Sequence, residues 1–227
     1  MLFISPPFGN YISTKNTTSI KGSFTLEPRD GLILQILKTL RYSFENKGWI
    51  NKIGLRNPGI DYAIKNYDKN SIVSIAIMNK EEIPKFIEKI PEDMNIEINI
   101  SCPNINKQMV NKDIDLFLNK KRKWCIIKLS PLTDFILIDN YYKQGFKQFH
   151  CCNTLPIEKG GLSGPVIIPH STNLIKKIRE KYPDSEIIGG GGIKSLNEIN
   201  IYKKSGANHF SISSALFNPF NYKIFLN

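Results

Sequence analysis

Short apolar runs bounded by turn residues recur along the whole chain and predict eight β-strands. Most of these runs are rich in β-branched residues and too short for helices, which favours strands. The predicted strands are 2–5, 23–27, 71–77, 95–101, 124–130, 148–153, 186–190 and 209–213.

Stretches with helical periodicity lie between several of these strands. They cover 80–90, 112–121, 133–144, 171–182 and 195–206. The last stretch opens with Ser195 and Glu198, which have the spacing of a capping box, and Gly206 stands where that helix would end. Segment 32–49 fits either a helix or a hairpin, and 51–64 predicts a polar loop before a helix near Ile60.

This alternation of strands and helices predicts a parallel sheet, and eight strands favour a (β/α)8 (TIM) barrel of the α/β class. The link between the first two strands is short and its sequence NYISTKNTTS does not resemble a helix. We therefore expect a compact barrel whose first crossover helix is missing. No linker or repeat interrupts the pattern, so one domain over residues 1–227 is predicted.

The composition is compatible with a protein that folds in a reducing compartment. The chain has 227 residues, 41% of them hydrophobic, and no apolar run of the roughly 18 residues that a membrane span needs. No basic segment precedes the short apolar N-terminus, so we expect a cytoplasmic protein without a signal peptide. The four cysteines form no CxxC pair and the three histidines lack ligand spacing, so free thiols and no metal are expected.

A net charge of +11 is compatible with a nucleic-acid partner, with an anionic ligand, or with neither. Because the lysines are spread along the chain rather than massed in one block, most of this charge is interpreted as a solvated surface. We expect no nucleic-acid or membrane partner.

Glycines and serines at the ends of predicted strands indicate a phosphate site. In a barrel the chemistry lies at the carboxyl ends of the strands, and glycine-rich loops there often bind phosphate. Three such segments are IIGGGGIKS (187–195), HFSISSALF (209–217) and GGLSGP (160–165). Ordinary tight turns are the alternative, but three tips that converge at one end favour an anion.

Two further strand ends carry reactive side chains. In NIEINISCPN (95–104) a strand ends at Cys102, which lies between Asn99 and Asn104. A lone cysteine there is more often a small buried hydrophobe than a catalytic group. Lys128 ends the run CIIKL, where a lysine either extends toward solvent or supplies fixed charge beside a ligand.

Seven motifs together resemble the dihydroorotate dehydrogenases, over about residues 4–217. In order they are TLEPRDG (25–31), INKIGLRNPGIDY (50–62), INISCPN (98–104), IIKLSP (126–131), NTL with GGLSGP (153–165), IIGGGGI (187–193) and ISSALF (212–217). The resemblance, to the soluble branch in shortened form, implies a (β/α)8 barrel that binds FMN and oxidises dihydroorotate to orotate in pyrimidine biosynthesis. It also implies that Cys102 is the general base, taking a proton from C5 while a hydride leaves C6 for the flavin.

Further roles follow from the resemblance, residue by residue. Substrate contacts are implied for Asn51, Gly54, Leu55, Asn99, Asn104, Asn153 and Thr154. Cofactor contacts are implied for Lys21, Asn99, Lys128, Gly164, Gly191, Gly192, Ser213 and Ser214. Lys21 stands one position early, because Gly22 occupies the slot where the family has lysine.

Missing segments leave alternatives open. A degenerate barrel that binds flavin or a partner without catalysis is one, and a tRNA dihydrouridine synthase is a weaker one, since Ser101 stands where that class has glycine. The electron acceptor implied is fumarate, or NAD through a partner subunit, and a homodimer is also left open.

Overall fold

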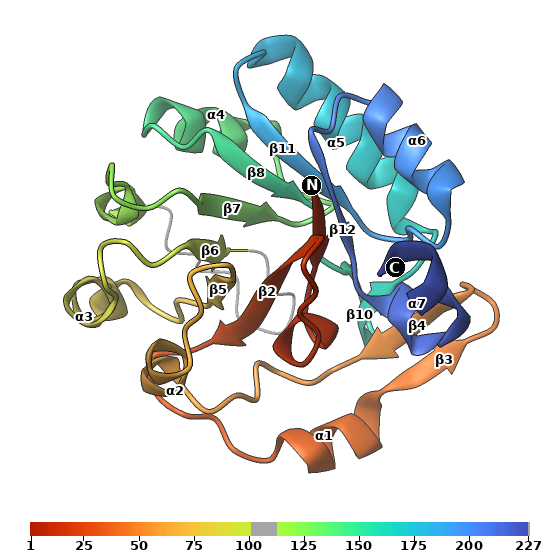
Figure 1. Cartoon of the computed structure of the whole chain (residues 1–227), viewed down its shortest axis with the longest axis horizontal. Helices are drawn as coiled ribbons and strands as arrows, with labels where there is room; N and C mark the ends of the chain where they lie inside the picture. The colour runs from red at the N-terminus through yellow and green to blue at the C-terminus, as the bar shows by residue number, and fades with distance from the viewer. Residues whose placement is uncertain (101–112, 227) are drawn as a thin grey trace.

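The computed structural model of the protein describes residues 1–100 and 113–226, and its centre is a closed barrel of eight parallel strands (Figure 1). Around the barrel the order is β1-β12-β11-β8-β7-β6-β5-β2. The bounds are β1 Leu2–Ile4, β2 Thr17–Phe24, β5 Ile72–Ile75, β6 Ile96–Asn99, β7 Cys125–Leu129, β8 Gln148–Cys151, β11 Glu186–Gly190 and β12 His209–Ile212. The predicted (β/α)8 barrel is confirmed.

The second barrel strand is the one that the sequence misplaced. It was predicted at 23–27, but β2 covers Thr17–Phe24 and the chain leaves the barrel at Thr25. There the Thr25 amide donates to Asn57 Oδ1 at 3.1 Å instead of joining a barrel neighbour. The first half of β2 is rich in hydroxyl side chains, so a search for apolar runs passed over it.

Helices cover the outside of the barrel, as Figure 1 shows. They are α2 Ile60–Lys65, α3 Ile83–Lys89, α4 Phe135–Lys143, α5 Ile167–Lys181 and α6 Leu196–Lys204, with a terminal α7 at Phe220–Phe225. The capping box of α6 is confirmed, since the Ser195 hydroxyl accepts from Asn197 N and Glu198 accepts from Ser195 N. Between β1 and β2 lies a single 3₁₀ turn, η1 Phe8–Asn10, so the prediction of a missing first helix is also confirmed.

The helix predicted at 112–121 is wrong for its described part. Residues 113–121 contain only a 3₁₀ turn, η3 Ile114–Phe117, and Leu118 is already extended. Asn119 Oδ1 then accepts from the backbone amides of Lys121 and Arg122. Such a local side-chain-to-backbone turn competes with the helical hydrogen bonds.

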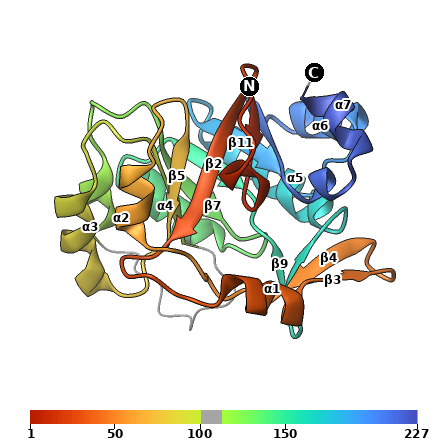
Figure 2. The same ribbon diagram turned by 60° about the horizontal axis from the view of Figure 1, so that its bottom comes forward.

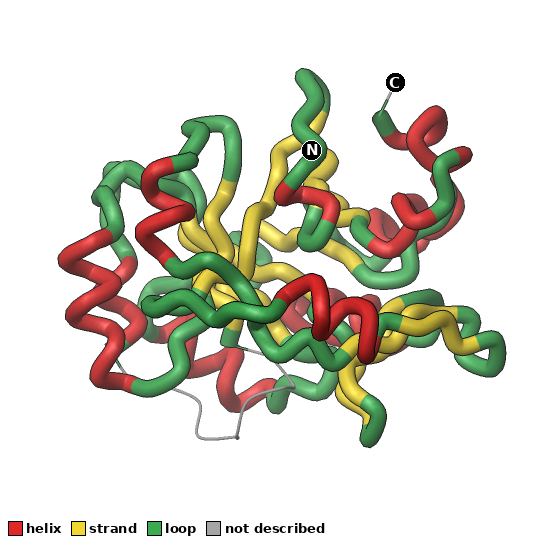
Figure 3. Tube along the Cα trace, turned by 90° about the horizontal axis from the view of Figure 1, so that it is seen from below, coloured by secondary structure: helices red, strands yellow, loops and turns green. Residues whose placement is uncertain are grey.

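A second sheet, which the sequence did not predict, is antiparallel and has the order β3-β4-β10-β9. Its strands are β3 Arg41–Ser43, β4 Gly48–Asn51, β9 Leu155–Ile157 and β10 Gly160–Ser163. Segment 32–49 thus holds both alternatives, a helix α1 (Leu32–Thr39) and the first hairpin strand. Figures 2 and 3 show α1 beside this sheet, at the end of the barrel toward which the β2 arrow points in Figure 2.

One predicted glycine turn has a different local structure, because β10 forms there. GGLSGP (160–165) was predicted to be a glycine turn that helps to bind phosphate, but its first four residues pair with β4 and β9. Gly48 on β4 lies so close to the Ser163 carbonyl that a side chain there would overlap it. Small residues therefore serve close strand pairing here.

Two apolar clusters form the core. The larger one lies between the barrel strands and the surrounding helices. The smaller one fills the barrel toward the amino ends of its strands and comprises Phe3, Ile20, Ile72, Trp124, Ile126 and Ile188. Within the described residues, no helix has both the length and the apolar character needed to cross a membrane.

Candidate functional site

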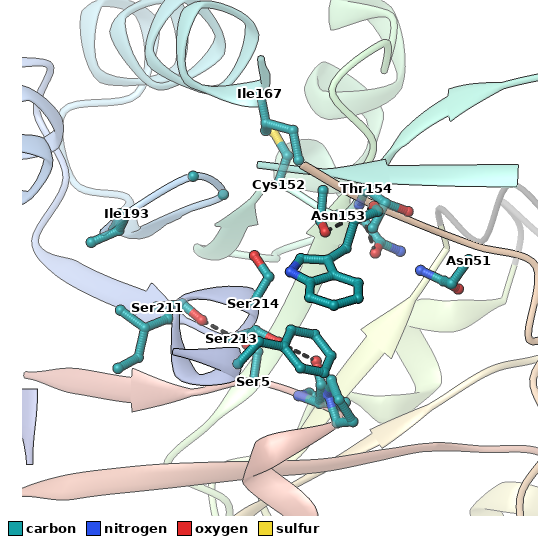
Figure 4. Close-up of a pocket in the computed structure, with 18 of the residues that line it drawn as sticks. Ser5, Asn51, Cys152, Asn153, Thr154, Ile167, Ile193, Ser211, Ser213 and Ser214 are labelled. Atoms are coloured by element: carbon teal, nitrogen blue, oxygen red, sulfur yellow. Dashed lines mark hydrogen bonds between the residues drawn. The ribbon is translucent and has the colours of Figure 1, made fainter. Parts of the chain in front are cut away.

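A cavity of about 280 Å³ opens at the carboxyl end of the barrel, beside the second sheet (Figure 4). Its wall combines strand ends of the barrel with β4, which supplies Trp49 and Asn51, and with η4 (Ser214–Phe217). Polar groups face an otherwise apolar lining, the usual character of a small-molecule site. The cavity therefore lies at the end of the barrel where the barrel rule predicts a site.

Many of the predicted site residues line this cavity. They are Asn51, Lys128, Asn153, Thr154, Gly191, Gly192, Ser213 and Ser214. They come from five separate parts of the chain, and Figure 4 shows the labelled ones around one space. The structure thus brings together groups that the sequence separates.

Two predicted residues lie directly behind the lining. Asn99 accepts a hydrogen bond from Asn153 Nδ2 at 3.2 Å, and its own Nδ2 donates to Ser23 Oγ at 2.8 Å. The Gly164 carbonyl lies against Gly192, since a Cβ on Gly192 would come within 2.7 Å of that oxygen. Asn99 and Gly164 thus each contact a residue that lines the cavity.

Lys21 is not among the residues that line the cavity. It lies on β2 opposite Val73, a member of the outer core cluster, while the adjacent Ile20 belongs to the cluster inside the barrel. Ser23, beyond an irregularity in β2, takes the inward position and contacts Asn99. The side chain next to the predicted amides is therefore a hydroxyl.

Gly54 and Leu55 also lie outside the cavity wall, in the loop after β4. Both have left-handed backbones, with φ of 69° and 56°. Asn57 holds this loop: its Nδ2 donates to the Leu55 carbonyl and to Thr25 Oγ1, and its Oδ1 accepts from Thr25 N and Gly59 N. Asn57 therefore stabilises the turns of the polar loop that the sequence predicted.

Cys102 and Asn104 lie outside the described residues, so the base predicted from the resemblance has no position here. β6 ends at Asn99, whose side chain faces the predicted substrate amide of Asn153. The chain thus leaves β6 beside the cavity and enters the undescribed segment two residues later.

The Gly191–Gly192 pair after β11 fits a close approach of an anion. Their φ values are 97° and 76°, a region that favours glycine. A Cβ on Gly191 would lie 2.5 Å from Ile167 Cγ2, so packing on the other side also requires glycine. Bare backbone N–H groups in such a conformation can bind phosphate oxygens.

The cavity also has an aromatic wall that the sequence analysis missed. Trp49 and Phe217 pack with ring centroids 4.4 Å apart, and Phe8 meets Phe217 edge-to-face at 5.0 Å. Trp49 reaches the barrel because β4 pairs with β10. No local signal in the sequence indicates that pairing.

The floor of the cavity contains a buried charged cluster, Glu97, Lys128 and His150, of which only Lys128 was predicted as a site residue. Glu97 is fully buried, and its Oε1 and Oε2 accept from Lys128 Nζ at 3.3 Å and His150 Nδ1 at 2.6 Å. The sequence did contain a signal for this cluster, namely a glutamate among the isoleucines of β6. A buried charge requires partners, so Glu97 indicated that other polar groups lie nearby.

The charges of this cluster follow from its contacts. Burial raises the pKa of Glu97, but Lys128 and His150 outweigh burial and the net result is a pKa lowered from 4.5 to about 2. Burial lowers the pKa of His150 below 6.5 in spite of Glu97. At neutral pH Glu97 is therefore a carboxylate and the imidazole of His150 is neutral.

The family model for dihydroorotate dehydrogenase matches residues 11–225. The catalytic subunit of dihydroorotate dehydrogenase B (NAD(+)) from Thermotoga petrophila is 27% identical and covers 96% of this chain and 93% of the relative. The subunit of the same name from Anoxybacillus flavithermus is 31% identical, with coverages of 85% and 71%.

A solved structure supports the fold. The ligand-free dihydroorotate dehydrogenase of Eimeria tenella superposes with a TM-score of 0.75 at 16% identity, over 97% of this chain and 80% of that chain. With the barrel, the amide-lined cavity and the family match over nearly the whole chain, the relationship is established. The chain is therefore a member of the dihydroorotate dehydrogenase family of oxidoreductases.

Proposed function

We propose that this protein is a dihydroorotate dehydrogenase that oxidises dihydroorotate to orotate with FMN, in pyrimidine biosynthesis. One observation carries the proposal: amides, a lysine and a glycine pair from distant parts of the chain line the same cavity. Amides can donate to and accept from a flat pyrimidine acid, and the family match supports such a substrate.

The lining of the cavity supports binding of both ends of FMN. Gly191 and Gly192, with Ser213 and Ser214 opposite, would hold the phosphate, and Gly164 supports the glycine pair from behind. The Lys128 ammonium would supply positive charge beside the flavin ring. FMN, when bound, supplies the hydride acceptor of the reaction.

Apart from Lys21, which does not line the cavity, the remaining predicted residues would bind and deprotonate the substrate. Asn51, Asn153 and Thr154 line the cavity, Asn99 orients Asn153, and Gly54, Leu55 and Asn104 complete the predicted set. Cys102 would remove the proton from C5. A thiol suits this task because its ordinary pKa of about 8.5 is near working pH.

The names of the relatives favour NAD, through a partner subunit, as the electron acceptor. A relative from Aquifex aeolicus, 27% identical over 75% of this chain, is provisionally assigned to the fumarate type, so fumarate is the second acceptor to test. We further propose a cytoplasmic protein, with a homodimer as the assembly to examine.

An anaerobic spectroscopic experiment tests the proposal. The purified protein should be yellow, and dihydroorotate should bleach its flavin band at roughly 450 nm. Cys102→Ala should stay yellow and bleach at least about a hundredfold more slowly, the lower range for general base catalysis. Cys125→Ala is the matched control, since the Cys125 thiol is buried away from the cavity and burial raises its pKa to about 12. A yellow wild type that does not bleach would instead indicate a non-catalytic flavin-binding barrel.

A further inference from the structure

At the floor of the cavity, two residues that the predicted site does not use, Glu97 and His150, lie beside Lys128. β6, β7 and β8 lie side by side, and their register places Asn99 opposite Lys128 and Lys128 opposite His150. Paired residues of adjacent parallel strands point to the same side, so all three side chains enter the barrel interior. Glu97, two residues before Asn99, points inward below them and contacts both Lys128 and His150.

Hydrogen bonding assigns the proton of the short contact. An ionised carboxylate can only accept, so His150 Nδ1 carries the hydrogen in its 2.6 Å contact with Glu97. The imidazole is neutral, which leaves Nε2 as an acceptor. His150 lines the cavity, and a Cβ on Gly190 would lie 3.2 Å from this Nε2, so a side chain there would crowd it.

The carboxylate divides its interactions between the cation and the imidazole. One oxygen accepts from Lys128 at 3.3 Å, a long contact, while the other accepts from His150 at 2.6 Å. Ser74 gives Glu97 a further hydrogen bond and meets Ser23, which in turn accepts from Asn99. The ammonium is thus held at the floor of the cavity by an ion pair that is longer than the contact between the carboxylate and His150.

We propose that Glu97 and His150 are positioning residues that determine where the Lys128 ammonium lies and how strongly its charge acts in the cavity. This rests on the proposed function, in which Lys128 faces bound FMN. Glu97 partly neutralises the cation, and His150 competes for the carboxylate and so keeps the cation from being drawn fully to it. The reduction potential of a flavin depends on charge beside its ring, so the two residues should act on it in opposite directions.

The first test is the midpoint potential of the flavin in the holoenzyme, without substrate. Glu97→Gln removes the negative charge and should favour reduced flavin about tenfold, a rise of ~30 mV for a two-electron couple. His150→Leu leaves the carboxylate free to draw the cation away and should lower the potential. His150→Gln, which keeps a donor toward Glu97, should restore most of the wild-type value.

Glu186→Gln is the matched control. Glu186 accepts from His209 Nε2 at 2.8 Å, another glutamate–histidine pair, but at the opposite end of the barrel. Its replacement should leave the potential unchanged. Shifts of the same sign in Glu97→Gln and His150→Leu, or no shift in either, would overturn the proposal, since a purely structural role predicts no opposition.

A second readout does not require flavin. Nitrogen-15 NMR of the purified protein at pH 7 should show His150 protonated at Nδ1 and bare at Nε2, and Glu97→Gln but not Glu186→Gln should disturb it. A cationic ring or the other tautomer would contradict the arrangement. A wild type that lacks flavin would count against the proposed function, whereas the tautomer would still decide the positioning claim. If Glu97→Gln does not fold, the His150 pair of variants and the wild-type tautomer still decide it.

Discussion

The two ends of the barrel interior are built from the same strands but have opposite chemistry. Along β7, Ile126 packs in the apolar cluster, and Lys128, the next inward residue, enters the cavity floor. The same change occurs on β5, from Ile72 to Ser74, while β2 changes from Ile20 to Ser23. In each strand the apolar residue lies toward the amino end and the polar residue toward the carboxyl end.

The contrast separates stability from function within one interior. At the amino end Phe3 and Trp124 pack edge-to-face at 5.4 Å, an arrangement that excludes water and holds the strands together. At the carboxyl end every buried charge or amide must find a partner, and these partners orient the groups that face the cavity. The following changes test how far that division holds.

The largest effect is expected from leaving one buried charge without its partner. Glu97→Leu removes the carboxylate that accepts from Lys128 and His150, and should lower the free energy of unfolding by about 3–5 kcal/mol. Denaturant titration measures it. The double variant Glu97→Leu with Lys128→Met removes both charges and should recover much of the loss. Equal losses in the single and double variants would mean that shape, not charge, decides stability at this end.

The apolar end should respond nearly as strongly, through packing alone. Ile126 is fully buried, so Ile126→Ala should lower the free energy of unfolding by about 3 kcal/mol, and the control Ile126→Val by about 1 kcal/mol. Calorimetry or denaturant titration provides the values. Substrate binding per folded molecule should not change, because Ile126 does not line the cavity. A clear change in binding would show that the two ends are coupled.

Acidification should act mainly on the polar end. The pKa of Glu97 is lowered to about 2 in the fold, so its stabilisation is present above the ordinary pKa of 4.5 and is lost as the pH falls from there toward 2. The pKa of His150 is also lowered, so its contribution is lost as the pH falls below 6.5. The loss of both contributions should lower the free energy of unfolding by on the order of 2 kcal/mol between pH 7 and pH 3.5.

Unfolding measured at a series of pH values would show this decline, and Glu97→Gln should flatten the part below pH 4.5. A wild type and a Glu97→Gln variant with parallel profiles would assign the acid sensitivity to other groups.

The smallest effect is expected where a similar pair lies in contact with solvent. Glu186 and His209 repeat the glutamate–histidine contact, but the Glu186 side chain is 39% exposed. Glu186→Gln should therefore change the free energy of unfolding by only about 0.5 kcal/mol. If Glu186→Gln lowered the free energy of unfolding almost as much as Glu97→Leu, burial would not explain the difference between the two ends.

Local patterns sufficed for most of the barrel and for part of the site. The apolar runs predicted seven barrel strands close to their observed bounds, and the spacing of Ser195 and Glu198 predicted the start of α6. Gly191 and Gly192 at the end of β11 line the cavity in the left-handed conformations that glycine favours, and the phosphate site assigned to them stays a prediction.

The misses share a physical cause. Trp49 faces the cavity only because β4 pairs with β10, across more than a hundred residues of chain. His150 becomes a partner of Glu97 only when β6, β7 and β8 align in register. Such contacts depend on closing long loops, and no pattern within a short window encodes them.

Taken alone, the sequence determined the strand and helix periodicity, the absent first crossover helix and the small residues that end the barrel strands. Each of these follows from interactions between residues a few positions apart. The tertiary structure decided the second sheet, the outward position of Lys21 and the charged floor beneath the cavity. Those features require strand register and burial, because burial disfavours the charge of Glu97 and only the register brings Lys128 and His150 close enough to stabilise the carboxylate.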